Sequence, residues 1–178
     1  MFTIERTGFF CRKSRLVAPA KLTDKEFREV ASNLSQPVVK ARKIGLVAAR
    51  KAEQEQPIVT LWNGHETTNT AQPGDWVVTS LTPDRKVLRD NGGNANAYVI
   101  KADKFPLLYD PTAGSNEFGE FFEAKGLVEA VYLSGGFDIA APWGQRQISR
   151  AGYLVLNGDE VYGNHKETFE TTYEVMKQ

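Results

Sequence analysis

Histidine and carboxylate side chains are the groups in this chain that could support acid–base catalysis. His65 precedes Glu66 in a polar segment, and His165 stands at the expected start of a short helix. A histidine works as a general acid or base when a positioned partner lies within hydrogen-bond reach. Glu66 and Asp75 are candidate partners, although solvent-exposed loop histidines are the favoured interpretation. The catalytic candidates are therefore His65, Glu66 and His165.

Metal and thiol chemistry have little support in the sequence. Zinc needs three or four His, Cys or carboxylate ligands, and this chain has two histidines without paired spacing and one cysteine. We therefore predict no metal site, and the sequence leaves the cofactor unknown. Neighbouring cations would lower the pKa of Cys11, but its place in an expected strand favours burial as a small apolar residue. A single cysteine also fits a reducing cytoplasm.

Aromatic residues are the richest resource for ligand binding, with three Trp, six Tyr and ten Phe. Such rings can serve as platforms for ligands or nucleobases, and they can equally fill a core. Candidate ligand-binding residues are those where polar groups meet aromatic residues near expected turns. They are Trp62, Asp75, Trp143, Gln145 and Arg146.

The charges are balanced overall but unevenly distributed. The chain of 178 residues has 22 basic and 22 acidic residues. Residues 1–56 carry 12 basic and 6 acidic residues, a net charge of +6, so the remainder carries −6. This asymmetry could steer an anionic partner, but mutual neutralisation of the two parts is the favoured interpretation. A nucleic-acid surface would use Lys40, Arg42, Lys43, Arg50 and Lys51.

Composition limits the class of protein. Hydrophobic residues at 41% and charged residues at 25% are typical of a globular protein, which excludes disordered, collagen-like and disulfide-rich classes. No apolar run reaches the roughly 18 residues of a membrane helix, and the first residues lack a signal-peptide pattern. We expect a cytoplasmic protein without a membrane segment. The oligomeric state is left open.

An internal repeat is the most informative pattern. We interpret Val38–Ile44 as the counterpart of Leu127–Leu133, with polar insertions in the first copy at 48–56 and 81–97. The closing segments match without a gap: Tyr98, Phe105, Tyr109 and Asp110 have the mutual spacing of Tyr162, Phe169, Tyr173 and Glu174. The sequence therefore predicts two related units.

Local signals complete the expected fold. Thr23 and Glu26 form a capping-box pattern, and apolar residues at helical spacing follow it, so a helix is expected over 24–34. Short helical turns are expected over 102–108 and 166–172, and most other segments read as strands. The prediction is an α+β, strand-dominated fold with two tandem small β units, barrel- or sandwich-like. Its parts are a strand–helix segment 1–36, repeat 37–110, connector 111–122 and repeat 123–178.

The segment Pro73–Val78 resembles the start of the motif of a bacterial, phage and fungal small-protein family known by Pro-Gly-Asp-Tyr-Gly. The closing segments Phe105–Asp110 and Phe169–Glu174 are similar to the Phe-x-x-x-Tyr-Glu ending of related phage proteins. This chain departs from the motif, because Trp76 and Val77 stand where Tyr and Gly are expected. The resemblance implies no catalytic residue, since the family is functionally uncharacterised.

The leading hypothesis is a cytoplasmic, non-catalytic binding or accessory module for an unknown small molecule or protein. One alternative is a small enzyme acting on a polar or phosphorylated metabolite with His65 or His165 as general acid–base. Another is a nucleic-acid-binding module, which the short basic runs do not favour.

Overall fold

The chain folds into curved β-sheets with few helical turns, as a computed structural model of residues 1–7 and 13–177 shows. The predicted strand-dominated α+β class is confirmed. The interpretation of Cys11 falls outside the described residues. In the described part of the chain, no helix has the length and apolarity needed to cross a lipid bilayer.

The fold consists of two compact units, which differ from the expected division of the sequence. The terminal unit comprises residues 1–43 and 127–178, and the central unit comprises residues 44–126. The expected connector 111–122 is not a linker: it contributes to two paired strands of the central unit, β9 (Tyr109–Asn116) and β10 (Gly119–Ala124). In β10 the consecutive residues Phe121 and Phe122 are both buried and belong to two different apolar clusters, so this segment is part of the core of the central unit.

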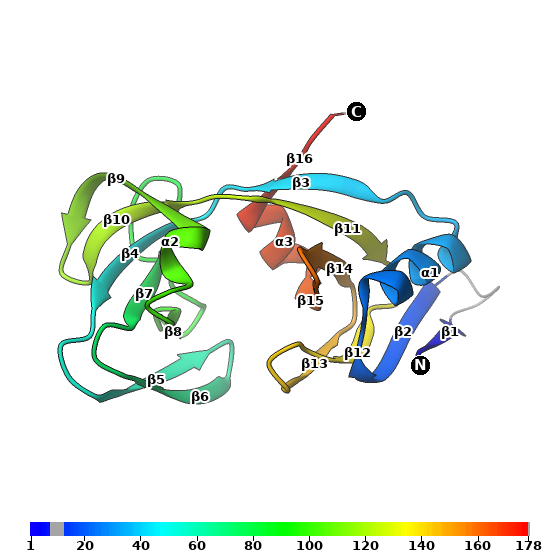
Figure 1. Ribbon diagram of the computed structural model, residues 1–178, viewed down its shortest axis with the longest axis horizontal. Coiled ribbons are helices and arrows are strands. Elements are labelled where there is room, and N and C mark those ends of the chain that lie inside the picture. The colour runs from blue at the N-terminus through cyan, green and yellow to red at the C-terminus, as the bar shows by residue number, and fades with distance from the viewer. Residues whose placement is uncertain (8–12, 178) are drawn as a thin grey trace. The chain divides into compact units, whose positions relative to one another are not determined.

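The terminal unit contains two sheets and one long helix (Figure 1). One sheet has the order β1-β2-β12-β13 and the other has the order β15-β14-β11-β3-β16. The elements are β1 (Thr3–Thr7), β2 (Lys13–Lys21), α1 (Asp24–Leu34), β3 (Val39–Lys43), β11 (Leu127–Leu133), β12 (Phe137–Ala140), β13 (Arg146–Ser149), β14 (Gly152–Asn157), β15 (Glu160–His165), α3 (Lys166–Thr172) and β16 (Tyr173–Val175).

Helix α1 begins and ends where its capping residues require. The Thr23 hydroxyl accepts from the Glu26 amide at 3.2 Å, and the Glu26 carboxylate accepts from the Thr23 amide at 3.0 Å. The helix buries Phe27 and Val30 in the core of the terminal unit. It ends at Ser35, which adopts a left-handed backbone with φ 51°. The predicted bounds of this helix are confirmed.

The central unit contains a five-stranded sheet of order β8-β7-β4-β10-β9 and a separate hairpin of β5 and β6. Its remaining elements are β4 (Leu46–Lys51), β5 (Gln56–Trp62), β6 (His65–Ala71), β7 (Trp76–Leu81), β8 (Ala97–Ile100) and α2 (Phe105–Leu108).

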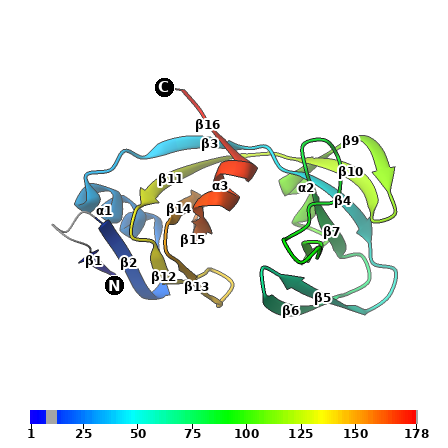
Figure 2. The same cartoon turned by 180° about the vertical axis from the view of Figure 1, so that it is seen from behind.

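The two five-stranded sheets have the same connectivity across their edges. In the central unit α2 joins the edge strands β8 and β9, and in the terminal unit α3 joins the edge strands β15 and β16. In both ribbon views α3 lies beside β14 and β15 (Figure 1, Figure 2). Tyrosine hydroxyls from the opposite edges meet at 2.9 Å in each unit. Each sheet is therefore strongly curved, so that its edges approach each other.

Both units also share one arrangement of stacked rings. Phe105 stacks on Trp76 with ring centroids 4.1 Å apart and lies 5.1 Å from the ring of Tyr109. Phe169 stacks on Tyr153 at 4.0 Å and on Tyr173 at 4.6 Å. The aromatic spacing noted in the sequence thus corresponds to one phenylalanine held between two rings in each unit.

One part of the sequence alignment is wrong. Val38–Ile44 and Leu127–Leu133 do not occupy matching positions, because they supply β3 and β11, which pair with each other in the terminal unit. The strand of the central unit that matches β11 is β4. In the central sheet β4 pairs with β7, which lies beside the edge strand β8, and in the terminal sheet β11 pairs with β14, which lies beside the edge strand β15. In the sequence, Gly45-Leu46-Val47 then matches Gly126-Leu127-Val128.

This correction changes which strands belong together. With β4 matched to β11, β10 takes the place in the central unit that β3 takes in the terminal unit. The terminal sheet thus contains β3, which precedes the central unit in the sequence, whereas β10 follows β9 directly within residues 44–126. The expected insertion 48–56 is in part the strand β4 itself. Short apolar runs of similar composition do not indicate which strands pair, so the sequence could not distinguish the alignment of β11 with β3 from its alignment with β4.

Candidate functional site

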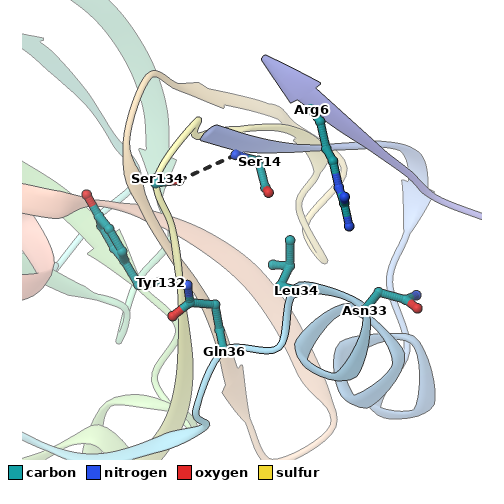
Figure 3. A pocket seen from close by; sticks show the side chains of 7 residues that line it. All are labelled: Arg6, Ser14, Asn33, Leu34, Gln36, Tyr132 and Ser134. Atoms are coloured by element: carbon teal, nitrogen blue, oxygen red, sulfur yellow. Dashed lines mark hydrogen bonds between the residues drawn. The ribbon is translucent and has the colours of Figure 1, made fainter. Parts of the chain in front are cut away.

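A polar hollow of about 220 Å³ lies in the terminal unit and is the candidate site. Figure 3 shows its lining side chains arranged around an opening between β1, β2, α1 and the end of β11. Six of the seven lining residues carry polar side chains; the set is Arg6, Ser14, Asn33, Leu34, Gln36, Tyr132 and Ser134. The volume is below the roughly 300–1,000 Å³ of pockets for drug-sized ligands, so a small molecule or one end of a larger molecule fits.

Strand periodicity places Arg6 at this hollow. Phe2 and Ile4 pack against the core of the terminal unit, and Arg6 follows at the next alternate position on the same face of β1. Arg6 lies directly opposite Ser14 in the β1–β2 register, and directly opposed residues share a face. At this end of the β1–β2 pair, Arg6 and Ser14 therefore occupy the face that apolar core residues occupy further along the strands.

The other side of the hollow comes from α1 and β11. Leu34 is half-buried and packs against the core, whereas Asn33 and Gln36 are exposed at the helix end. Tyr132 and Ser134 are half-buried at the end of β11. The hydroxyl oxygen of Ser134 accepts from the Ser14 amide at 3.4 Å, as the dashed line in Figure 3 marks. The Ser134 hydroxyl proton remains able to donate to a ligand.

His165, a catalytic candidate, has a structural partner instead of a carboxylate. Its Nδ1 lies 2.8 Å from the hydroxyl oxygen of Ser149, and that hydroxyl donates to the carbonyl of Ala151 at 2.7 Å. A serine hydroxyl has one proton, so Nδ1 must be the donor to Ser149. The ring therefore cannot take the serine proton through Nδ1, and this contact is not a nucleophile–base pair.

Asp75, a ligand-binding candidate, is a buried structural carboxylate. It accepts hydrogen bonds from the Lys101 ammonium at 2.9 Å, from the Gln72 amide at 3.0 Å and from the Ala102 amide at 3.3 Å. The turn of residues 72–75 is thereby connected to the segment before α2. The Lys101 hydrogen bond, with the two amide bonds, holds the pKa of Asp75 below its usual value.

The lowered pKa of Asp75 predicts a specific loss of stability in acid. A carboxyl group with a lower pKa in the folded state stabilises the fold above its unfolded pKa of about 3.9 and loses that contribution as pH falls further. We expect Asp75→Asn to lower the stability at neutral pH and to reduce the loss of stability below about pH 4. Urea unfolding from pH 2.5 to 7, measured for both proteins, checks this; parallel pH profiles would contradict it.

The remaining candidates in the central unit lie on the β5–β6 hairpin. Trp62 is half-buried and lies opposite His65 in the strand register, while Glu66 is exposed and lies opposite Leu61. Trp62 and Glu66 are neighbours along this hairpin, and neither is among the residues that line the hollow.

The candidates of the terminal unit are only partly brought together. The indole N–H of Trp143 donates to the Gln145 side-chain oxygen at 3.3 Å, and its ring lies 5.9 Å from that of Tyr162. Arg146 instead forms a bidentate ion pair with Asp138. Trp143 is 55% exposed, and it is not among the residues that line the hollow.

The basic residues proposed for nucleic acid are divided between the units. Lys40, Arg42 and Lys43 lie in the terminal unit, and Arg50 and Lys51 lie in the central unit. Arg42 pairs with Glu174, and the Lys51 ammonium lies 5.4 Å from the centre of the Trp76 ring. These local partners give two of the five cations a structural role.

Sequence reasoning missed every residue of the hollow. Its members come from four separate segments, and none belongs to a motif. One signal in the sequence could have indicated Arg6. Phe2, Ile4 and Arg6 occupy alternate positions, so a charged residue follows two apolar residues on the same face of the expected strand.

Neither metal ligation nor similarity to known proteins assigns a role to the chain. No group of three or more His, Cys, Asp or Glu side chains is gathered among the residues that the structure describes. No protein-family model, curated protein or solved structure matches this chain.

Proposed function

We propose that this protein is a cytoplasmic, non-catalytic binding or accessory module whose terminal unit holds a small polar ligand in the hollow of Figure 3. The observation that carries the proposal is that six residues with polar side chains, contributed by four segments, line one opening. A cytoplasmic location is supported by the single cysteine.

A binding role accounts for the hollow better than the histidine mechanism does. Hydroxyl and amide groups around a concave opening provide orientation and specificity for a polar molecule. His165 is committed to Ser149, and Asp75 is committed to Lys101. Two of the groups proposed to move or accept a proton are therefore engaged in local structure, while six residues with polar side chains line the hollow.

The two units are proposed to be copies of one module with different roles. Their matching sheet orders and ring stacks support an internal duplication. The segments β1, β2 and α1 that form the hollow have no counterpart in the central unit. The ligand-binding role therefore belongs to the terminal unit.

Thermal unfolding with a panel of small polar probes tests the proposed function. The panel contains glucose, glutamine, succinamide, succinate and inorganic phosphate. A ligand at 100 times its dissociation constant adds about 2.7 kcal/mol of stability, and we expect at least one probe to stabilise the protein. Gln36→Trp places a large ring at the rim of the hollow and should abolish that stabilisation.

The matched control is Gln54→Trp, which places the same ring on an exposed bend of the central unit. This variant should keep the full stabilisation. If no probe stabilises the protein, or if both variants respond alike, the hollow is not the site.

A further inference from the structure

We infer that the hollow of the terminal unit binds an oxyanion group, a carboxylate or a phosphate, on the guanidinium of Arg6. This inference rests on the proposed function and names the chemical class of its ligand. It follows from the charge of the hollow, the donors that line it and the strand position of Arg6.

Among the residues that the structure describes, Arg6 is the only one with a charged side chain that lines the hollow. Within the described part of the chain, Arg6 has no ion pair or side-chain hydrogen bond, unlike Arg28 and Arg146, which form ion pairs with carboxylates. An uncompensated guanidinium beside polar side chains favours an anion. The described lining of the hollow therefore carries one positive charge and no carboxylate.

The two carboxylates that line a hollow together with Arg6 have cationic partners of their own. A neighbouring hollow of about 610 Å³ shares Arg6 and contains Glu26 and Glu29. Glu26 accepts from the amino group of Met1 at 2.8 Å, and Glu29 lies 3.8 Å from the Lys25 ammonium. These two carboxylates are directed to other cations, which leaves Arg6 for a ligand.

The remaining lining groups can complete the coordination of an oxyanion. A guanidinium offers paired N–H donors that match a carboxylate or phosphate in a bidentate arrangement. The Ser134 hydroxyl keeps its proton for donation because its oxygen accepts from Ser14. The side-chain amides of Asn33 and Gln36 add N–H donors at the rim.

A purely structural role for Arg6 makes a different prediction. β1 is an edge strand of its sheet, and an inward-facing charge on an edge strand can prevent unwanted strand pairing. Such a role requires no ligand, so it predicts aggregation of an Arg6 variant without any change in anion binding.

Two pairs of probes that differ in charge test the inference on the full-length protein. Succinate is compared with succinamide, and glycerol 3-phosphate is compared with glycerol, by titration calorimetry. We expect one anion to bind at least about 10-fold more tightly than its neutral counterpart, and the two anions distinguish a carboxylate source from a phosphate source. Arg6→Gln should weaken that binding about 10- to 100-fold.

Arg6→Lys should restore part of the affinity, because it keeps the charge and loses the bidentate geometry. The control is Arg150→Gln, which removes another exposed arginine without a described partner and should leave binding unchanged. Circular dichroism and gel filtration verify that each variant remains folded and monodisperse to the same degree as the parent protein.

The outcomes separate this inference from the proposed function. Equal binding of the charged and neutral probes, or unchanged anion binding in Arg6→Gln, overturns the oxyanion inference. Loss of a neutral probe in Gln36→Trp would still support the hollow as a binding site. Failure of all four probes to bind overturns the oxyanion inference, and the wider thermal panel then decides the proposed function.

Discussion

Phe169→Ala is expected to lower the free energy of unfolding of the terminal unit by about 3–5 kcal/mol. Phe169 is fully buried and lies between the rings of Tyr153 and Tyr173, 4.0 and 4.6 Å away. Truncation removes both stacking contacts and leaves a cavity that the curved sheet cannot fill. Because α3 joins the two edges of that sheet, the loss also loosens its closure.

Urea unfolding combined with hydrogen exchange measures this effect where it occurs. Faster exchange of backbone amides is expected in β14, β15 and β16, because these strands lie around the Phe169 ring. Phe169→Leu, which keeps most of the buried volume, is the matched control and should lose less than about 1.5–2 kcal/mol. Equal effects of the two substitutions would show that ring stacking and cavity size do not limit the stability of the unit.

Gly136→Ala is expected to destabilise the terminal unit by about 2–5 kcal/mol. Gly136 has φ 77°, and a Cβ atom there would clash with the carbonyl oxygen of Ser149. The obstacle is backbone, and Ser149 pairs with Phe137 in the β12–β13 ladder. The clash can therefore be relieved only by disturbing that pair of strands.

Gly158→Ala provides the control for backbone strain alone. Gly158 has φ 64°, but a Cβ atom there meets nothing within 4 Å. It should cost only about 1–2 kcal/mol, the preference of a non-glycine residue against a left-handed backbone. The difference between the two urea midpoints measures the close approach of Gly136 to Ser149, and equal midpoints would contradict this account.

Local signals in the sequence predicted several elements well. The helix bounds 24–34 are confirmed because the capping box of Thr23 and Glu26 determines where the helix begins. The short helix 166–172 is also confirmed, and in each unit the repeated aromatic residues mark the ring stacks. The helix ends and the ring pairs Phe105–Tyr109 and Phe169–Tyr173 depend on contacts between residues close together in the chain.

Features that depend on distant contacts were not predictable. The partner of β3 is β11, far along the chain, and two similar apolar runs gave no means to distinguish a repeat from a pair. The role of Asp75 depends on Lys101, which is 26 residues away. The hollow brings Arg6 beside Tyr132 and Ser134 through tertiary packing alone.

The insertion of the central unit between β3 and β11 has a consequence for folding during synthesis. Residues 44–126 contain every strand of the central unit, so this unit can fold while the rest of the chain is still being made. Arg42 and Leu127 are direct neighbours in the finished sheet. While residues 44–126 are unfolded, pairing β3 with β11 closes a long flexible loop. Once the central unit has folded, the flexible chain between these two strands is short, which lowers the entropic cost of pairing them. Because β3 precedes the central unit and β11 follows it in the sequence, β3 emerges from the ribosome long before the strand with which it pairs. The terminal unit is therefore completed after the central unit.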